Sequence, residues 1–304
     1  MSLLLFLNEL SCSTSQSPNR VDAMMEDFVT LLRHVRERRP ATSLVSLVRR
    51  EDLELAKGYF LTQWIGARPR NKELWRSMKA MQNRAPFGSV LPPGVADRAD
   101  YRVGKAEALG LGAAHLMDGL LVSLLAGNTW NAVHVAATCD ELTEGSGEIT
   151  TRPVTVRHAA IAEHAQFHDA WISRAGLSDF NNGAKIWQAR ADVYPHLQFL
   201  PRVADDLEKL IADWIGPVAD RLADLNEAAG RWEPTTAPEP SWLSKVTGEG
   251  ETRSRLCWFD DLDGKRRLFD QHARFTPGEG RIHFRLVPEE RKVRIAYAGL
   301  KLGI

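Results

Sequence analysis

The sequence predicts an α+β fold: an N-terminal mixed α/β part, a long amphipathic helix, and a small C-terminal antiparallel β unit. Apolar residues recur at three- and four-residue spacing over Met24–Val35 and over Leu207–Leu225, as on one face of a helix. A stretch rich in proline, Arg231–Ser241, follows the second of these segments, and short strand-like segments follow the prolines. We therefore expect three parts: residues 1–175, a helical segment and linker at 176–240, and a basic β unit at 241–304.

The chain has 304 residues, of which 44% are hydrophobic and 26% charged, so it is long enough to bury a sizeable core. Leu3–Leu7 predicts a buried strand rather than a signal peptide, because Asn8 and Glu9 interrupt the apolar run at once. Further elements of the N-terminal part are expected as follows: a helix capped by Asn19 or Asp22 and ended by Pro40, a strand at Ser43–Val48, and a helix at Asn71–Arg84.

A core helix is expected over Ala106–Leu125, which is strongly apolar but interrupted by charged residues and glycines that make it too polar for a membrane span. Trp130–Ala137 and Ile149–Val156 predict a hairpin joined by a polar loop at Asp140–Gly147, and His158–Ile172 predicts a helix. The long helix over Leu207–Leu225 is expected to bend at Pro217.

Four strands are expected after the linker: Arg255–Phe259, Arg267–Phe275, Arg281–Val287 and Val293–Ala298. Alternation within the third strand places Ile282, Phe284 and Leu286 on one face of the sheet. The opposite, polar face is expected to carry Arg281, His283 and Arg285, joined by His272 and Arg274 of the preceding strand. In the last strand, Val293, Ile295 and Tyr297 are expected to share a face opposite Arg294.

Charge is balanced over the whole chain, with 39 Lys and Arg against 39 Asp and Glu, so no global field attracts nucleic acid or membrane. From Ser241 onward there are 13 basic and 9 acidic residues, whereas the first 240 residues carry 26 and 30. This split indicates that a polyanionic partner would meet the C-terminal part, although chance variation in surface charge is an equal alternative. Cys12, Cys139 and Cys257 form no CxxC pair, which is typical of a reducing cytoplasm.

The segment from Gly280 to Lys301 contains R-I-H-F-R, an acidic turn, an apolar strand and I-A-Y-A-G-L-K. This pattern resembles the last hairpin of RelE/ParE/HigB-type toxins, many of which cleave mRNA without a metal. The resemblance implies phosphate-stabilising roles for Arg281 and Arg285 and a place near the scissile phosphate for Lys301. It also implies that His272, His283 and Tyr297 are candidates for proton transfer during cleavage.

The leading hypothesis is therefore an RNA-directed protein, a metal-independent endoribonuclease of toxin or phage-defence type that meets RNA or the ribosome and needs no cofactor. Arg274 would belong to the catalytic face, and Lys265, Arg266 and Arg267 would bind the substrate. The simplest alternative is a structural hairpin with solvated side chains. A further alternative is a non-enzymatic component of a multi-subunit bacterial defence system, with a protein partner from the same operon and tryptophans such as Trp258 at the interface.

A second candidate site lies on the predicted helix after residue 158. His164 and His168 are four residues apart on that helix, so their rings would project from one face, and His158 would complete a zinc site. The hypothesis that follows is a metal-dependent hydrolase. The alternative is that these imidazoles pack beside Phe167 and Trp171.

Nearly the full chain also resembles a group of uncharacterised bacterial proteins. The matching features are Phe6–Ser11, Gly110–Ser123, Arg157–Ala159, Glu163–His164 and the terminal R-I-H-F. This resemblance implies that both parts form one architecture, and it implies no activity.

Overall fold

The computed structural model describes residues 3–92, 99–142 and 148–303. Its contacts divide the chain into an N-terminal unit, Ser2–Ile172, and a C-terminal unit, Ser173–Ile304. Residues 176–240, which the composition predicted as a separate helical segment and linker, contribute helices to the core of the C-terminal unit. Most of the predicted Asp140–Gly147 loop, residues 143–147, lies outside the described residues.

The N-terminal unit is built on an eight-stranded sheet in the order β5-β2-β1-β8-β10-β9-β6-β7. The first five strands are parallel, and β9, β6 and β7 continue the sheet in antiparallel fashion. The predicted buried strand is confirmed as β1, which has parallel neighbours on both sides. The strands span Leu3–Leu7 (β1), Thr42–Val45 (β2), Gln82–Arg84 (β5), Ala99–Val103 (β6), Ala106–Glu107 (β7), Leu120–Val122 (β8), His134–Leu142 (β9) and Ile149–Ala159 (β10); a separate small hairpin is formed by Glu54–Ala56 (β3) and Tyr59–Phe60 (β4).

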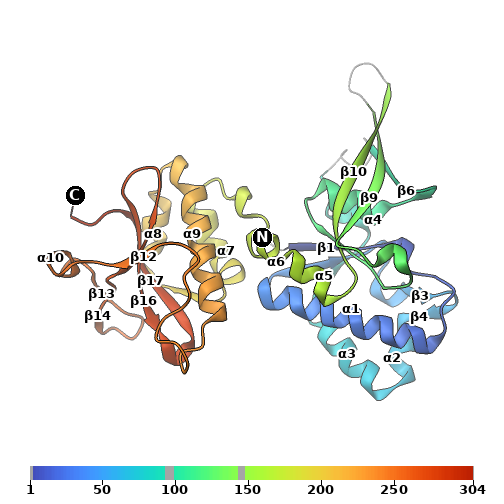
Figure 1. Cartoon of the computed structure of the whole chain (residues 1–304), viewed down its shortest axis with the longest axis horizontal. Helices are drawn as coiled ribbons and strands as arrows, with labels where there is room; N and C mark the ends of the chain where they lie inside the picture. Colours follow the sequence, from blue (N-terminus) through green and yellow to red (C-terminus); the bar gives the residue numbers. More distant parts are fainter. Residues whose placement is uncertain (1–2, 93–98, 143–147, 304) are drawn as a thin grey trace. The chain divides into compact units, whose positions relative to one another are not determined.

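Helices pack on this sheet through apolar faces. The first helix begins at Pro18, and its cap is Ser17, whose side chain accepts a hydrogen bond from the Arg20 N–H; the predicted caps Asn19 and Asp22 lie inside the helix. Figure 1 shows α1 and α4 on opposite sides of β1. The helices span Pro18–Arg38 (α1), Leu61–Ala67 (α2), Pro69–Lys79 (α3), Leu109–Leu116 (α4), Ala162–Phe167 (α5) and Asp169–Arg174 (α6).

The prediction of one core helix over Ala106–Leu125 is wrong. The helix α4 ends at Leu116, the chain turns at Asp118 with φ +47°, and the remaining apolar residues form β8 between β1 and β10. A strand buried on both faces is a continuous apolar run, which periodicity does not distinguish from a buried helix. Among the residues that the structure describes, no helix has the length and apolar character needed to span a bilayer.

The C-terminal unit contains a five-stranded sheet in the order β11-β17-β16-β15-β12, antiparallel except for the parallel pair β11 and β17. Figure 1 shows the helices α7, α8 and α9 on one side of this sheet and the small hairpin β13–β14 with α10 on the other. The strands span Leu197–Phe199 (β11), Val246–Gly248 (β12), Trp258–Asp260 (β13), Arg266–Leu268 (β14), Gln271–Phe275 (β15), Gly280–Val287 (β16) and Lys292–Leu300 (β17); the helices span Gly183–Val193 (α7), Val203–Glu208 (α8), Ala212–Arg231 (α9) and Glu251–Ser254 (α10).

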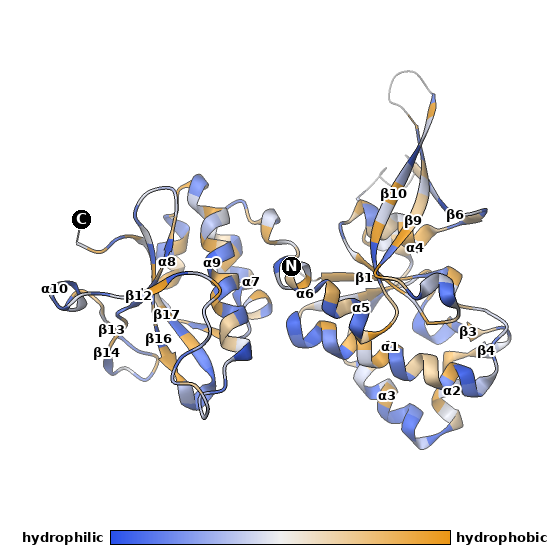
Figure 2. Cartoon of the chain, in the orientation of Figure 1, coloured by the Kyte–Doolittle hydropathy of each residue, from blue (hydrophilic) through white to orange (hydrophobic). Residues whose placement is uncertain are grey.

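The predicted long helix is confirmed as α9, which has 20 residues and contains Pro217. It begins at Ala212, and Leu207 at the predicted start belongs to the separate helix α8, which ends at Glu208. Apolar and polar residues alternate along α9, as they do along α1 (Figure 2), and its buried side packs on the apolar face of the sheet. That face includes Ile282 and Phe284, as the alternation predicted. The opposite face of the sheet carries the polar side chains and meets β13 and β14.

Candidate metal centre

Strand pairing brings together several of the side chains predicted for the polar face. His272 of β15 lies opposite His283 of β16, and their ring centroids are 5.4 Å apart. His283 in turn lies opposite Tyr297 of β17, with ring centroids 5.9 Å apart. The three predicted proton-transfer side chains therefore form a row across three neighbouring strands.

Tyr297 reaches this row because of a β-bulge, and its predicted face is wrong. The register shifts between His283 and Phe284, so that Phe284 pairs with Ile295 while His283 pairs with Tyr297. One extra residue, Ala296, is accommodated in β17, which reverses the alternation beyond it. Tyr297 therefore lies on the polar face rather than sharing the buried face of Ile295. Its hydroxyl donates to the Leu300 carbonyl oxygen at 2.6 Å.

The polar face is covered around its two histidines rather than open to solvent. His272 is 2% exposed and His283 is 0% exposed. The Cys257 sulfur lies 3.6 Å from His283 Nδ1, and the carboxylate of Asp261 accepts hydrogen bonds from Arg285 and Arg294. Segment 249–270 therefore forms a lid over the sheet.

The other predicted site residues are scattered. Arg285 is held by Asp261, Arg267 by Asp263, and Lys301 by Glu279 at 2.9 Å. Arg274, Lys265 and Arg266 are exposed. Of the ten side chains predicted for RNA cleavage and binding, four gather in the row and beside it: His272, Arg281, His283 and Tyr297.

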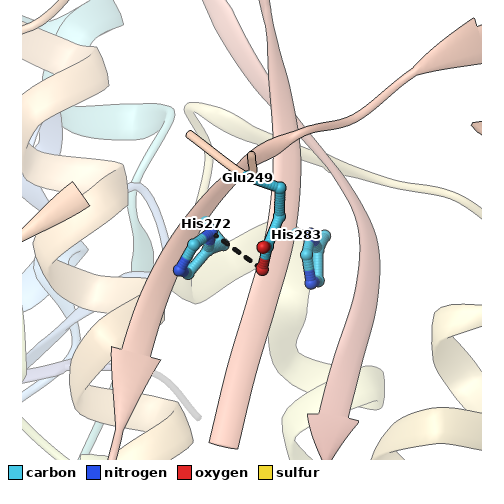
Figure 3. Close-up of side chains that lie close together, drawn as sticks. All are labelled: Glu249, His272 and His283. Atoms are coloured by element: carbon cyan, nitrogen blue, oxygen red, sulfur yellow. Dashed lines mark ion pairs between the residues drawn. The ribbon is translucent and has the colours of Figure 1, made fainter. Parts of the chain in front are cut away.

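Glu249, just after β12, completes a cluster with the two histidines. Figure 3 shows its carboxylate between the rings of His272 and His283. Glu249 Oε1 is 3.4 Å from His272 Nδ1 and 3.5 Å from Arg281 Nε. Within the described ranges, Glu249, His272 and His283 are the one group of three His, Cys, Asp or Glu side chains whose donor atoms all lie within 4.8 Å of one another. The sequence analysis missed Glu249, because a single carboxylate in an irregular segment has no periodic or motif signal.

Burial sets the electrostatics of this cluster. Loss of solvation lowers the pKa of His283 to about 4, and it lowers the pKa of His272 as well. Both rings are therefore neutral at physiological pH, the form in which imidazole binds metal ions. Three buried nitrogens in the cluster lack a hydrogen-bond partner among the described residues: His272 Nδ1, Arg281 Nε and His283 Nε2. Buried polar atoms are rarely left without partners, and of these three the two imidazole nitrogens have the chemistry to bind a metal ion.

The histidines predicted as a zinc site in the N-terminal unit are not arranged as one. His158 lies on β10, where its Nε2 accepts a hydrogen bond from the Ser123 hydroxyl at 2.7 Å and its Nδ1 donates to the Ala132 carbonyl at 2.6 Å. His164 Nδ1 accepts from the Ala160 N–H at 3.3 Å, and His168 Nε2 donates to the Val133 carbonyl at 2.8 Å. These nitrogens are occupied by protein partners.

Ser123 and His158 belong to a buried network at the carboxyl ends of three parallel strands. Asn8 follows β1 and donates from Nδ2 to the Ser123 hydroxyl at 2.9 Å, and Ser123 follows β8. All three side chains are 1% exposed or less. Buried polar groups that satisfy one another fix the register of neighbouring strands, so the network stabilises the centre of the sheet.

Acidification should destabilise the N-terminal unit through His158. Burial lowers the pKa of His158 to about 4, whereas the unperturbed value is 6.5. Between these values the unfolded chain binds the proton more readily, so stability present at neutral pH is lost as the pH falls from 6.5 to 4, by about 3 kcal/mol in all. Urea unfolding at several pH values should show this loss in the wild type and a smaller one in His158→Gln. An identical pH dependence in both proteins would contradict the assignment.

The fold and the site define a class: a two-unit α+β protein whose C-terminal sheet carries a buried cluster of one carboxylate and two imidazoles. Comparisons with protein-family models, with curated proteins and with solved structures each found no match. The geometry of the cluster is therefore the basis for a function, and the toxin-like character of the last hairpin stays a prediction.

Proposed function

We propose that the C-terminal unit binds a zinc ion through Glu249, His272 and His283, and that the protein is a metal-dependent hydrolase. One observation carries the proposal: the donor atoms of these three side chains all lie within 4.8 Å of one another. Two of the nitrogens in the cluster, His272 Nδ1 and His283 Nε2, are buried and have no hydrogen-bond partner among the described residues. The sequence predicts the hydrolase class from other histidines, His158, His164 and His168, and the geometry favours this cluster instead.

The spacing fits an ion better than it fits direct hydrogen bonds. Zinc bonds to nitrogen and oxygen are about 2.0–2.1 Å long, and in a tetrahedron they separate neighbouring donor atoms by about 3.3 Å. Glu249 Oε1 and His272 Nδ1 are 3.4 Å apart. A direct hydrogen bond would bring these atoms to about 2.7–3.2 Å. The separation is therefore compatible with two donors at neighbouring corners of a coordination tetrahedron, and Arg281 Nε lies at a similar distance, 3.5 Å, from the same oxygen.

Two imidazoles and one carboxylate form the donor set of hydrolytic zinc sites, which keep the fourth position for water. Cys257 lies near His283, with its sulfur 3.6 Å from Nδ1, but it lies outside the group of three donors. With zinc held by Glu249, His272 and His283, the fourth position would be open to water, which the metal would activate as a nucleophile.

Charge in the site favours an anionic substrate. A divalent ion with one carboxylate and two neutral imidazoles has a net charge of about +1, and the guanidinium of Arg281 adds another. The Arg281 side chain is only 6% exposed, so water screens this charge weakly. With zinc bound, Arg281 would be placed to stabilise the negative charge that develops on a phosphate or carboxylate ester during hydrolysis.

Zinc analysis of the untagged protein tests the proposal. We expect about one zinc per chain in the wild type and a loss of at least tenfold in affinity in Glu249→Gln, which keeps the shape of the side chain but removes its charge. His134→Ala, a change at an exposed histidine of the N-terminal unit, is the matched control and should keep its zinc. Cobalt substitution adds a spectroscopic readout, because tetrahedral cobalt absorbs visible light. Absence of zinc and of any cobalt spectrum in the folded wild type would overturn the proposal.

A further inference from the structure

We propose that a surface pocket beside the cluster binds one nucleotide unit of the substrate, with its base on Trp258 and its phosphate on Arg202 and Arg266; this inference rests on the proposed hydrolase. The pocket has a volume of about 310 Å³ and is lined by residues from β13, β14 and the loop before α8. It lies entirely within the C-terminal unit.

Arg202 is held in place before any ligand arrives. Its guanidinium donates to the Ala296 carbonyl at 3.2 Å and to Asp206 at 3.1 Å. The same group lies over two aromatic rings, 4.9 Å from the centroid of Phe259 and 5.4 Å from that of Tyr297. A guanidinium fixed in this way loses little entropy when it binds a phosphate, and it keeps the planar geometry that suits phosphate oxygens.

Trp258 and Arg266 provide the parts of the pocket that face solvent. Trp258 is 44% exposed, an unusual state for the largest apolar side chain. Arg266 is exposed and lies opposite Asp260 in the pairing of β13 with β14. An exposed aromatic ring beside two guanidinium groups, opposed in the pocket by the single carboxylate of Asp260, matches a stacked base and its phosphate.

Tyr297 connects this pocket to the cluster. Its ring lies 5.4 Å from the guanidinium of Arg202 on one hand and 5.9 Å from the ring of His283 on the other. Tyr297 thus lies between Arg202 of the pocket and His283 of the cluster, so the bound nucleotide unit would occupy the surface next to the covered histidines. The pocket supplies the aromatic recognition that the cluster lacks, which selects phosphate esters of nucleotides among the anions.

Binding measurements on the full chain test the inference with two probes. We expect AMP or a short single-stranded oligoribonucleotide to bind, and Trp258→Ala and Arg266→Gln each to weaken binding about tenfold. Arg255→Gln, a change at an exposed arginine outside the pocket, is the matched control and should bind as the wild type does. Binding of AMP alone identifies a free nucleotide as the ligand, whereas preferential binding of the oligonucleotide, weakened by salt, identifies a strand. Either result supports the inference.

Failure of the pocket and failure of the metal centre are distinguishable, because they depend on different side chains. Zinc content measured in the same preparations should be unchanged in Trp258→Ala and Arg266→Gln, which also shows that the unit is folded. If the zinc-loaded wild type binds neither probe, or if both pocket variants bind as tightly as the wild type, the nucleotide inference is overturned while the zinc site stands. Tight binding of a protein in place of either probe would overturn it as well.

Discussion

Gly183→Ala should destabilise the C-terminal unit by about 3 kcal/mol or more, a large effect for the addition of one methyl group. Gly183 is the first residue of α7, and a Cβ atom built there would lie 1.8 Å from the carbonyl oxygen of Leu207 at the end of α8. The obstacle is backbone, so no side-chain rotation relieves it. Ile186 and Leu207 are both 0% exposed, and moving either helix would therefore open the core.

Urea unfolding followed by circular dichroism measures this effect. Gly66→Ala is the matched control, because Gly66 lies in helix α2, is exposed, and has open space around its Cβ position. Alanine there should leave stability unchanged or raise it by up to about 1 kcal/mol, since glycine is the poorer helix former. A Gly183→Ala protein as stable as the wild type would show that α7 and α8 are less closely packed than the structure has them.

The sequence predicts the face of a strand on which a side chain lies best where the two-residue alternation matches a buried face and a polar face. Alternation in β16 correctly separated Ile282 and Phe284 from His283, because one face of that strand meets the helices and a one-residue slip would bury charge. The same rule failed for Tyr297, since nothing in the local sequence marks the bulge at Ala296. The position of a bulge depends on tertiary packing and cannot be predicted from the sequence of one strand.

For a related reason, the sequence predicts the two histidines of the candidate site but not its carboxylate. His272 and His283 were identified because both lie on strands whose period places them on one face, and strand pairing then brings them together. Glu249 comes from an irregular segment, and its place beside them depends on how the lid folds over the sheet. The burial of the polar face could not be predicted from the alternation either. That face is covered by segment 249–270, which is not part of the sheet and is anchored by Asp261.

Asp261→Ala should cost about 3–5 kcal/mol of folding free energy, the largest effect expected of a polar change in the C-terminal unit. The side chain is 0% exposed, and it accepts hydrogen bonds from Arg285 at 2.8 Å, Arg294 at 2.7 Å and Arg267 at 3.1 Å. Burial raises the pKa of Asp261, but hydrogen bonds from the Leu262 N–H, Arg294 and Arg285 outweigh burial and hold it below its usual value.

Removing this carboxylate leaves Arg294, whose side chain is 7% exposed, with a buried charge that, among the described residues, Gln198 and Glu290 still bind. A buried ion pair need not stabilise a fold relative to an apolar replacement, but deleting one member leaves the other without compensation. The same deletion releases the lid from the polar face, so hydrogen exchange should increase in β13 and β14 before it increases in α9.

Asp263→Ala separates this effect from a general loss of negative charge. Asp263 lies two residues away and also binds Arg267, but its side chain is 47% exposed. Water can therefore replace its hydrogen bonds, and we expect no measurable change in urea unfolding. If both variants unfold at the same urea concentration as the wild type, the lid is not anchored through Asp261. If only Asp261→Ala is destabilised and it also loses zinc, the buried carboxylate maintains both the lid and the metal centre beneath it.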